Sequence, residues 1–268
     1  MPRKRGKVDK KRRMYIIISV VFAALMLLPA WFRSAPGGNV ISKADLEKYL
    51  YTPDPRNLTI ILFLASPKVC PLCPEVANNV TQAVELLKTL ELHQKLNVTV
   101  TFKEFVCSNF PTCNNKEAAV NFQVYRVSQV PLILLSYRGF LVPIDPVGMG
   151  PQRLASLIFQ WYTVMRSAWK PPEVGKYLLY LYDKAHESPY LTTLEEQAKL
   201  NGVTLVKLGC EQYPSNCTNT TALSTMLVLG VRPQDLPLAI VYKDGRAVAA
   251  AKVDVLKGVD VILQALKN

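Results

Sequence analysis

A nearly continuous apolar run followed by two closely spaced cysteines is the feature that most constrains the fold. Residues 57–65 read NLTIILFLA and are rich in β-forming side chains. Such a run predicts a strand that is buried on both faces of a sheet. The motif Cys70-Pro71-Leu72-Cys73 follows closely, and proline favours the first position of a helix. The sequence therefore predicts an α/β fold in which a central strand leads through this motif into a helix that reaches about residue 96.

The rest of this half of the chain alternates between strand and helix patterns. Further strands are predicted at 98–106, 132–137 and 140–144, and helices near 42–51, 116–124 and 151–169. Strand–helix–strand–helix, followed by a hairpin and a helix, resembles the order of the thioredoxin fold.

The same order recurs after a proline-containing linker at residues 169–173. Strand patterns appear at 176–182, 203–209, 238–242 and 247–251, and a helix pattern at 255–266. The pair Leu236-Pro237 stands before the second hairpin as Val130-Pro131 stands before the first, and Ser188-Pro189 matches Cys70-Pro71. We therefore predict two tandem thioredoxin-like domains, at 40–169 with C-x-x-C and at 174–268 without it.

Cys70 and Cys73 are the candidate catalytic residues. Disulfide exchange needs a thiolate, whereas a free cysteine has a pKa of about 8.5. Unpaired amides and the dipole at a helix N-terminus stabilise negative charge, so we expect a lowered pKa for Cys70, and Lys68 either adds positive charge or is merely solvated. Cys73, one turn further on, can attack a mixed disulfide on Cys70 and release the product. The central proline resembles the CPxC motifs of glutaredoxins and bacterial oxidants, which implies an exchanger more oxidising than thioredoxin.

Two alternatives use the same cysteines: an inert disulfide, or half of a zinc site. Zinc takes four ligands, typically completed by a second C-x-x-C or by a histidine pair. His93 and His186 are isolated in the sequence, and neither has a suitable spacing from a cysteine. The sequence therefore favours redox chemistry and implies neither a metal nor a cofactor.

Val130 and Pro131 are the candidate substrate-binding residues. In thioredoxin-like proteins the matching proline is cis, and the backbone beside it pairs with the bound substrate like an added strand. The alternative is an ordinary trans proline in a turn. The resemblance implies the cis form at Pro131 and, with a purely architectural role, at Pro237.

The other four cysteines form two close pairs in matching loops, one in each unit. Cys107 and Cys113 follow the second strand of the first unit, and Cys210 and Cys217 follow that of the second. We predict two structural disulfides. The alternative is a relay that passes electrons to Cys70 and Cys73, but a relay in the second unit would have no C-x-x-C to serve.

The N-terminus carries most of the positive charge. Residues 1–13 contain eight basic side chains and one acidic one, and so contribute +7 of the net charge of +12. This predicted cytoplasmic tail lacks interleaved aromatic residues, which disfavours nucleic-acid binding. Residues 14–32 follow as an apolar segment of a length close to that of a bilayer core, so we predict a single transmembrane anchor that contacts membrane lipid. A cleaved signal peptide is the alternative.

The flanking charge also predicts topology. Lys and Arg on the N-terminal side of an anchor stay in the cytoplasm, which places the two domains outside it. Asn-x-Ser/Thr sequons, all of which follow the apolar segment, begin at Asn57, Asn79, Asn97, Asn216 and Asn219. Closely paired cysteines are typical of an oxidising, extracytoplasmic compartment.

Two families resemble this pattern. Tandem thioredoxin-fold protein disulfide oxidoreductases of archaea share the architecture, although they are soluble and usually carry C-x-x-C in both units. The redox subunit of the eukaryotic oligosaccharyltransferase is similar over about residues 45–170, where Pro55-Arg56-Asn57-Leu58-Thr59 leads through an apolar strand to Cys70. That subunit differs in having several membrane helices after its redox domain.

Three functions are compatible with these features. The first is a membrane-anchored thiol–disulfide oxidoreductase that acts on cysteine-containing exported polypeptides through Cys70 and Cys73. The second, implied by the oligosaccharyltransferase resemblance, is an accessory subunit of a membrane glycosyltransferase complex that captures acceptor proteins as mixed disulfides. The third is a non-catalytic scaffold that binds partners through the groove near Pro237.

Overall fold

The computed structural model describes residues 41–92 and 96–267. The predicted basic tail (1–13) and membrane anchor (14–32) lie outside these ranges. Within them, every helix is too short or too polar to cross a bilayer.

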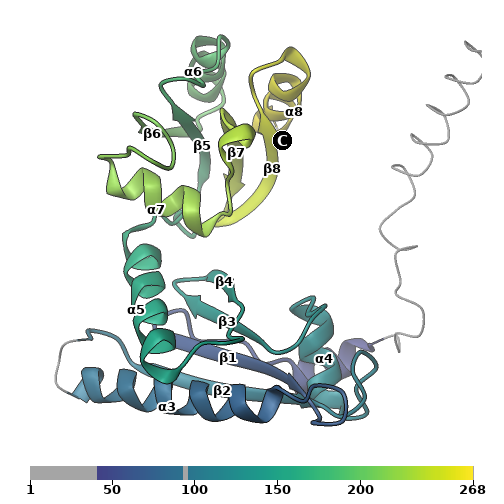
Figure 1. Ribbon diagram of the computed structural model, residues 1–268. Coiled ribbons are helices and arrows are strands. Elements are labelled where there is room, and N and C mark those ends of the chain that lie inside the picture. The colour runs from purple at the N-terminus through teal and green to yellow at the C-terminus, as the bar shows by residue number, and fades with distance from the viewer. Residues whose placement is uncertain (1–40, 93–95, 268) are drawn as a thin grey trace, which may run out of the picture.

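The described chain forms two four-stranded sheets, one after the other (Figure 1). The first contains, in spatial order, β2 (Val100–Cys107), β1 (Leu58–Ala65), β3 (Leu132–Tyr137) and β4 (Phe140–Ile144). The second contains β6 (Thr204–Cys210), β5 (Lys176–Asp183), β7 (Leu238–Lys243) and β8 (Arg246–Lys252). In both sheets the first two strands along the chain pair in parallel, the third pairs antiparallel with the first, and the fourth pairs antiparallel with the third. The predicted α/β class and the tandem thioredoxin-like order are confirmed.

β1 is the centre of the first unit, and all eight of its residues are buried. Its alternate side chains serve two apolar clusters, one on each face of the sheet. Ile60, Leu62 and Leu64 pack in the cluster that contains Cys70 and Cys73. Ile61 and Phe63 pack in the cluster that contains the other two cysteines of the unit. The predicted burial on both faces is therefore confirmed.

Helices cover both faces of each sheet. The first unit has α2 (Lys43–Tyr49), α3 (Cys73–Leu92), α4 (Lys116–Val124) and α5 (Pro151–Ser167). The second has α6 (Leu191–Leu200), α7 (Thr220–Val228), the short 3₁₀ helix η2 (Pro233–Asp235) and α8 (Leu256–Lys267). Buried residues of α3 and α5 share the cluster with Cys70 and Cys73, whereas those of α4 lie on the opposite face. The cysteine motif therefore lies at the edge of a helix-covered core.

The start of α3 differs from the prediction. The helix begins at Cys73 rather than at Pro71, because the preceding residues form a separate turn. The Cys70 N–H donates to the Ser66 carbonyl at 2.9 Å, and the Cys73 N–H donates to the Cys70 carbonyl at 3.1 Å. Pro74 is accommodated in the first turn, where its missing N–H costs no helical hydrogen bond.

The predicted linker at 169–173 is attached to the second unit through its first residue. Its Trp169 ring packs edge-on against Tyr177 and Tyr242, with centroid distances of 6.3 and 5.7 Å, and its N–H donates to the Thr225 hydroxyl at 2.8 Å. α5 ends at Ser167 and packs against α7 (Figure 1). Val228 of α7 also packs on the core of the first unit. The two units therefore share an apolar contact.

Candidate functional site

A tight turn between β1 and α3 carries Cys70 and Cys73. The two residues form a disulfide with a Cα–Cα distance of 5.4 Å, well within the range that a disulfide spans. The turn is fixed by two N–H groups, those of Val69 and Cys70, which both donate to the Ser66 carbonyl at 2.9 Å. The cysteine pair is thus held by backbone geometry at the end of a buried strand.

The two sulfurs have different surroundings. Cys73 is 2% exposed, and its Sγ accepts a hydrogen bond from the Ala65 N–H at 3.4 Å. Cys70 is 7% exposed and lies between two exposed apolar side chains, Val69 (46%) and Leu72 (51%). Cys70 is therefore the more exposed of the two cysteines, and the exposed apolar residues Val69 and Leu72 flank it in the sequence as an apolar rim.

Val130 and Pro131 lie at the same end of the sheet as this turn. β3 begins at Leu132, which pairs antiparallel with Phe63, two residues before β1 ends. The Val130–Pro131 peptide bond is cis, as predicted, and Val130 packs on the apolar cluster that contains both cysteines. The structure thus places the candidate substrate-binding residues at the same end of the sheet as the cysteine pair.

A second disulfide closes the loop that is hydrogen-bonded to the Cys70 turn. Cys107 ends β2 and is joined to Cys113, and both are buried. The Ser66 N–H donates to the Cys107 carbonyl at 3.1 Å, and the Ser66 hydroxyl donates to the Ser108 carbonyl at 2.8 Å. Ser66 therefore ties the Cys70 turn to the loop that this disulfide closes, a role that no sequence pattern indicates.

The equivalent position in the second unit holds a serine. Ser188 follows the end of β5 by five residues, as Cys70 follows the end of β1. It is buried, its N–H donates to the Tyr180 hydroxyl at 2.7 Å, and its own hydroxyl donates to the Val253 carbonyl. Ser188 is thus held by internal hydrogen bonds. The Leu236–Pro237 peptide bond is cis, as predicted.

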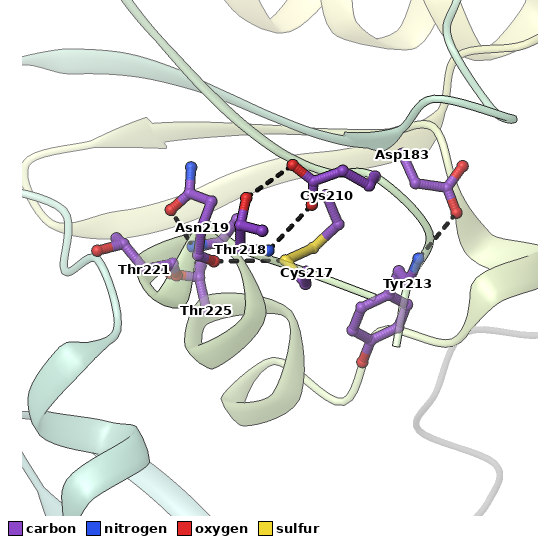
Figure 2. The surroundings of a disulfide bond; sticks show 10 residues. Asp183, Cys210, Tyr213, Cys217, Thr218, Asn219, Thr221 and Thr225 are labelled. Carbon is purple, nitrogen blue, oxygen red and sulfur yellow. Dashed lines mark hydrogen bonds between the residues drawn. A yellow bond between two sulfur atoms is a disulfide. The ribbon is translucent and has the colours of Figure 1, made fainter. Parts of the chain in front are cut away.

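Another polar contact of this unit links β5 to the loop after β6. The buried Asp183 accepts from His186 Nδ1 at 2.7 Å and from the Tyr213 N–H at 3.3 Å, the latter bond being drawn in Figure 2. His186 therefore pairs with a carboxylate, while His93 lies outside the described residues. Within the described ranges, no three metal-ligating side chains gather.

The loop after β6 is closed by the disulfide between Cys210 and Cys217 (Figure 2). Cys210 is buried, whereas Cys217 is half-exposed. The Thr218 N–H and hydroxyl donate to the Glu211 carboxylate at 2.9 and 2.7 Å. These two hydrogen bonds are the largest causes of a Glu211 pKa lowered to about 2.

Four residues that contribute to these sites were not predicted from the sequence. Ser66 and the half-buried Phe110, which packs on both clusters of the first unit, are brought in by long-range contacts. Cis bonds at Pro111 and Pro214, one inside each disulfide-closed loop, gave no signal either, because an isolated X-Pro pair is usually trans. The matching position of these prolines in the two units is the only pattern that could have drawn attention to them.

No protein-family model and no curated protein sequence matches this chain. Solved structures do. A zinc-bound form of human ERp44 is 12% identical over 85% of this chain, with a TM-score of 0.31, and this chain spans 60% of its length. The first two thioredoxin domains of Saccharomyces cerevisiae Eps1p are 13% identical over 88% of this chain and 98% of their own, with a TM-score of 0.32. ERdj5 is 11% identical over 86% of this chain and 30% of its own, with a TM-score of 0.29.

The fold assignment rests on the molecule itself. Both sheets have the same strand order and the same mixture of parallel and antiparallel pairing. Each also has a cis proline immediately before its hairpin. The chain is a tandem of two thioredoxin-like units.

Proposed function

We propose that this protein is a thiol–disulfide oxidoreductase whose reacting groups are Cys70 and Cys73. The observation that carries the proposal is the Cys70–Cys73 disulfide in a turn that joins a buried strand to a helix, with an apolar rim beside it. An inert structural disulfide needs no such rim, whereas a polypeptide substrate needs a surface to dock on.

The exchange follows from the position of the two sulfurs. A substrate thiolate attacks Cys70 Sγ, the Cys70–Cys73 bond breaks, and Cys73 leaves as a thiolate beside the Ala65 N–H. The second thiolate of the substrate then attacks the substrate sulfur that is bonded to Cys70 in the mixed disulfide. This attack forms the substrate disulfide and expels Cys70 as a thiolate. The substrate dithiol loses two electrons and two protons, and the cysteine pair takes up the two electrons and, through solvent, the two protons. The reverse sequence reduces a substrate disulfide.

Substrate binding is assigned to Val130 and Pro131. Both lie at the sheet end from which the Cys70 turn emerges, at the start of an antiparallel strand. An extended substrate segment that pairs with the backbone here would place its cysteine over the rim formed by Val69 and Leu72. We accordingly propose extended, cysteine-containing segments of exported polypeptides as substrates.

The cellular setting is proposed from the sequence. The segment 14–32 would anchor the protein in a membrane with both thioredoxin-like units on the extracytoplasmic side. Three disulfides among the described residues fit an oxidising compartment. Association with a membrane glycosyltransferase stays a prediction of the resemblance over residues 45–170.

Trapping of the mixed disulfide tests the proposal. The full-length Cys73→Ala variant cannot resolve an adduct on Cys70, so incubation with a disulfide-linked dimer of a single-cysteine peptide, whose cysteine is flanked by apolar residues, should yield a covalent complex. The Cys70 thiolate attacks the peptide disulfide, and the second peptide leaves as a thiolate. Mass spectrometry should place the peptide on Cys70, and dithiothreitol should release it. The matched Cys70→Ala variant should form no such complex. Equal adduct yields on the two variants, or none on either, would refute the proposal.

A further inference from the structure

The five sequons of this chain differ in how the fold holds them. An oligosaccharide on an asparagine is bulky and solvated, so it needs a surface position. A glycan added before folding at a half-buried asparagine would oppose the packing of that residue, and a sequon held by the fold is inaccessible afterwards. Side-chain exposure and hydrogen bonding can therefore distinguish acceptor sites from chance matches.

Two sequons of the first unit are held within its core elements. Asn57 is half-buried, and its partner Thr59 is fully buried in β1, where its hydroxyl bonds that of Thr101 at 2.8 Å. Asn79 is half-buried in α3, and its Nδ2 donates to the Met149 carbonyl at 3.3 Å. An oligosaccharide on that nitrogen would have to displace the segment that Met149 belongs to.

Two further sequons, at 216–218 and 219–221, are consecutive, and the first contains Cys217 of the Cys210–Cys217 disulfide (Figure 2). The Asn216 backbone is bridged to Gln212 through hydrogen bonds of 2.7 and 2.8 Å. The N–H and the hydroxyl of Thr218, the hydroxyl residue of that sequon, both donate to the Glu211 carboxylate. Asn219 caps α7 by accepting from the Ala222 N–H at 3.0 Å. Asn216 and Asn219 are both exposed, as Asn97 is, but these contacts fix their segment of the folded chain in a closed loop that cannot extend into a transferase.

The sequon at Asn97 has none of these constraints. Asn97 and Thr99 are both exposed, and their side chains make no hydrogen bond with any described residue. They precede β2, which is parallel to β1 with Val100 opposite Leu58 and Cys107 opposite Ala65. Asn97 therefore lies at the opposite end of the sheet from the Cys70 turn, about 25 Å away for strands of this length.

We propose that Asn97 is the N-glycosylation site of this protein and that the other four sequons are unmodified. Its Nδ2 forms a bond to the anomeric carbon of a lipid-pyrophosphate-linked oligosaccharide, the bond from that carbon to the pyrophosphate oxygen breaks, and the amide loses one proton. This inference rests on the extracytoplasmic placement in the proposed function. A glycan at this end of the sheet leaves the Cys70 rim open to substrate.

The test uses the full-length chain expressed in eukaryotic secretory cells. Peptide-N-glycosidase in ¹⁸O-water should convert Asn97 to ¹⁸O-labelled aspartate, and Asn97→Gln should remove the only glycan-dependent gel shift. The matched Asn79→Gln variant should keep that shift. An unmodified Asn97, or a glycan at any of the other four asparagines, would overturn the proposal.

A separate measurement keeps this result apart from the redox proposal. Protein made in bacterial cytoplasm and oxidised in vitro carries no glycan. The Cys73→Ala variant made in this way should still form the adduct on Cys70. If Asn97 carries no glycan in secretory cells but the Cys70 adduct still forms, only the modification site is refuted. If Asn97 carries the glycan but no Cys70 adduct forms, only the oxidoreductase proposal is refuted.

Discussion

Individual side chains distinguish the proposed reactive position of the first unit from the equivalent position of the second. Cys70 and Ser188 occupy the same position after a central strand, and each is followed three residues later by the first residue of a helix. Cys70 is flanked by exposed apolar residues, whereas Ser188 is enclosed by hydrogen bonds to Tyr180 and Val253. The second unit therefore has an internal polar contact at the position that Cys70 occupies in the first.

The carboxylate of Glu211 provides a pH-dependent prediction at this scale. Its pKa is lowered from 4.5 to about 2 because the Thr218 N–H and hydroxyl donate to the ionised form. A folded-state pKa below the unfolded value means that this contact stabilises the loop fully above pH 4.5 and is lost as the pH falls through about 2. An NMR titration of the Glu211 carboxyl carbon should give a midpoint near 2.

The control for this titration is Thr218→Val, which removes the hydroxyl and keeps the backbone N–H. The midpoint should rise only part of the way to 4.5, because the backbone hydrogen bond is the larger cause of the lowered pKa. A midpoint near 4.5 in the unmodified protein would show that these hydrogen bonds do not form in solution.

At the scale of helices and strands, much of the fold follows from the sequence because apolar runs identify buried strands. The predictions for α4, β3 and β4 agree with the structure at both ends. Two helices, α6 and α7, were not predicted, although Leu194 and Ala198 of α6 have the four-residue spacing of one buried face. The start of α3 was placed too early because the hydrogen bonds to Ser66 that form the turn have no local sequence signal.

The linker between the units gives a prediction about stability. Trp169 belongs to the linker in sequence but packs in the apolar cluster of the second unit, against Tyr177 and Tyr242. Because the ring is only half-buried, Trp169→Ala should lower the unfolding free energy of that unit by about 2–4 kcal/mol, below the loss for a fully buried tryptophan. Urea unfolding followed by hydrogen exchange of peptides from each unit would measure this loss.

Trp161 of α5 is the matched control, since it is also half-buried but packs on the core of the first unit. Trp161→Ala should therefore lower the protection of the first unit against hydrogen exchange, and Trp169→Ala should lower that of the second. Unchanged protection in the second unit of Trp169→Ala would show that the linker is not part of that core.

For the molecule as a whole, the candidate site could be predicted in part. Cys70, Cys73, Val130 and Pro131 could be singled out because motif spacing and strand order together imply that they meet at one sheet end. The brace through Ser66 and the contact between α5 and α7 could not, because both join segments that are distant in sequence. The second unit thus contributes a packed partner for the first, and the redox chemistry is assigned to the first unit alone.

The most direct test of this assignment is a stoichiometric transfer experiment. Oxidised full-length protein is mixed with one equivalent of a reduced dithiol peptide, the reaction is quenched with acid, and all thiols are mapped by mass spectrometry. The account predicts that the peptide disulfide appears together with free thiols at Cys70 and Cys73, while the Cys107–Cys113 and Cys210–Cys217 disulfides persist. A peptide that stays reduced beside an intact Cys70–Cys73 bond, or one that is oxidised at the expense of another pair, would contradict it.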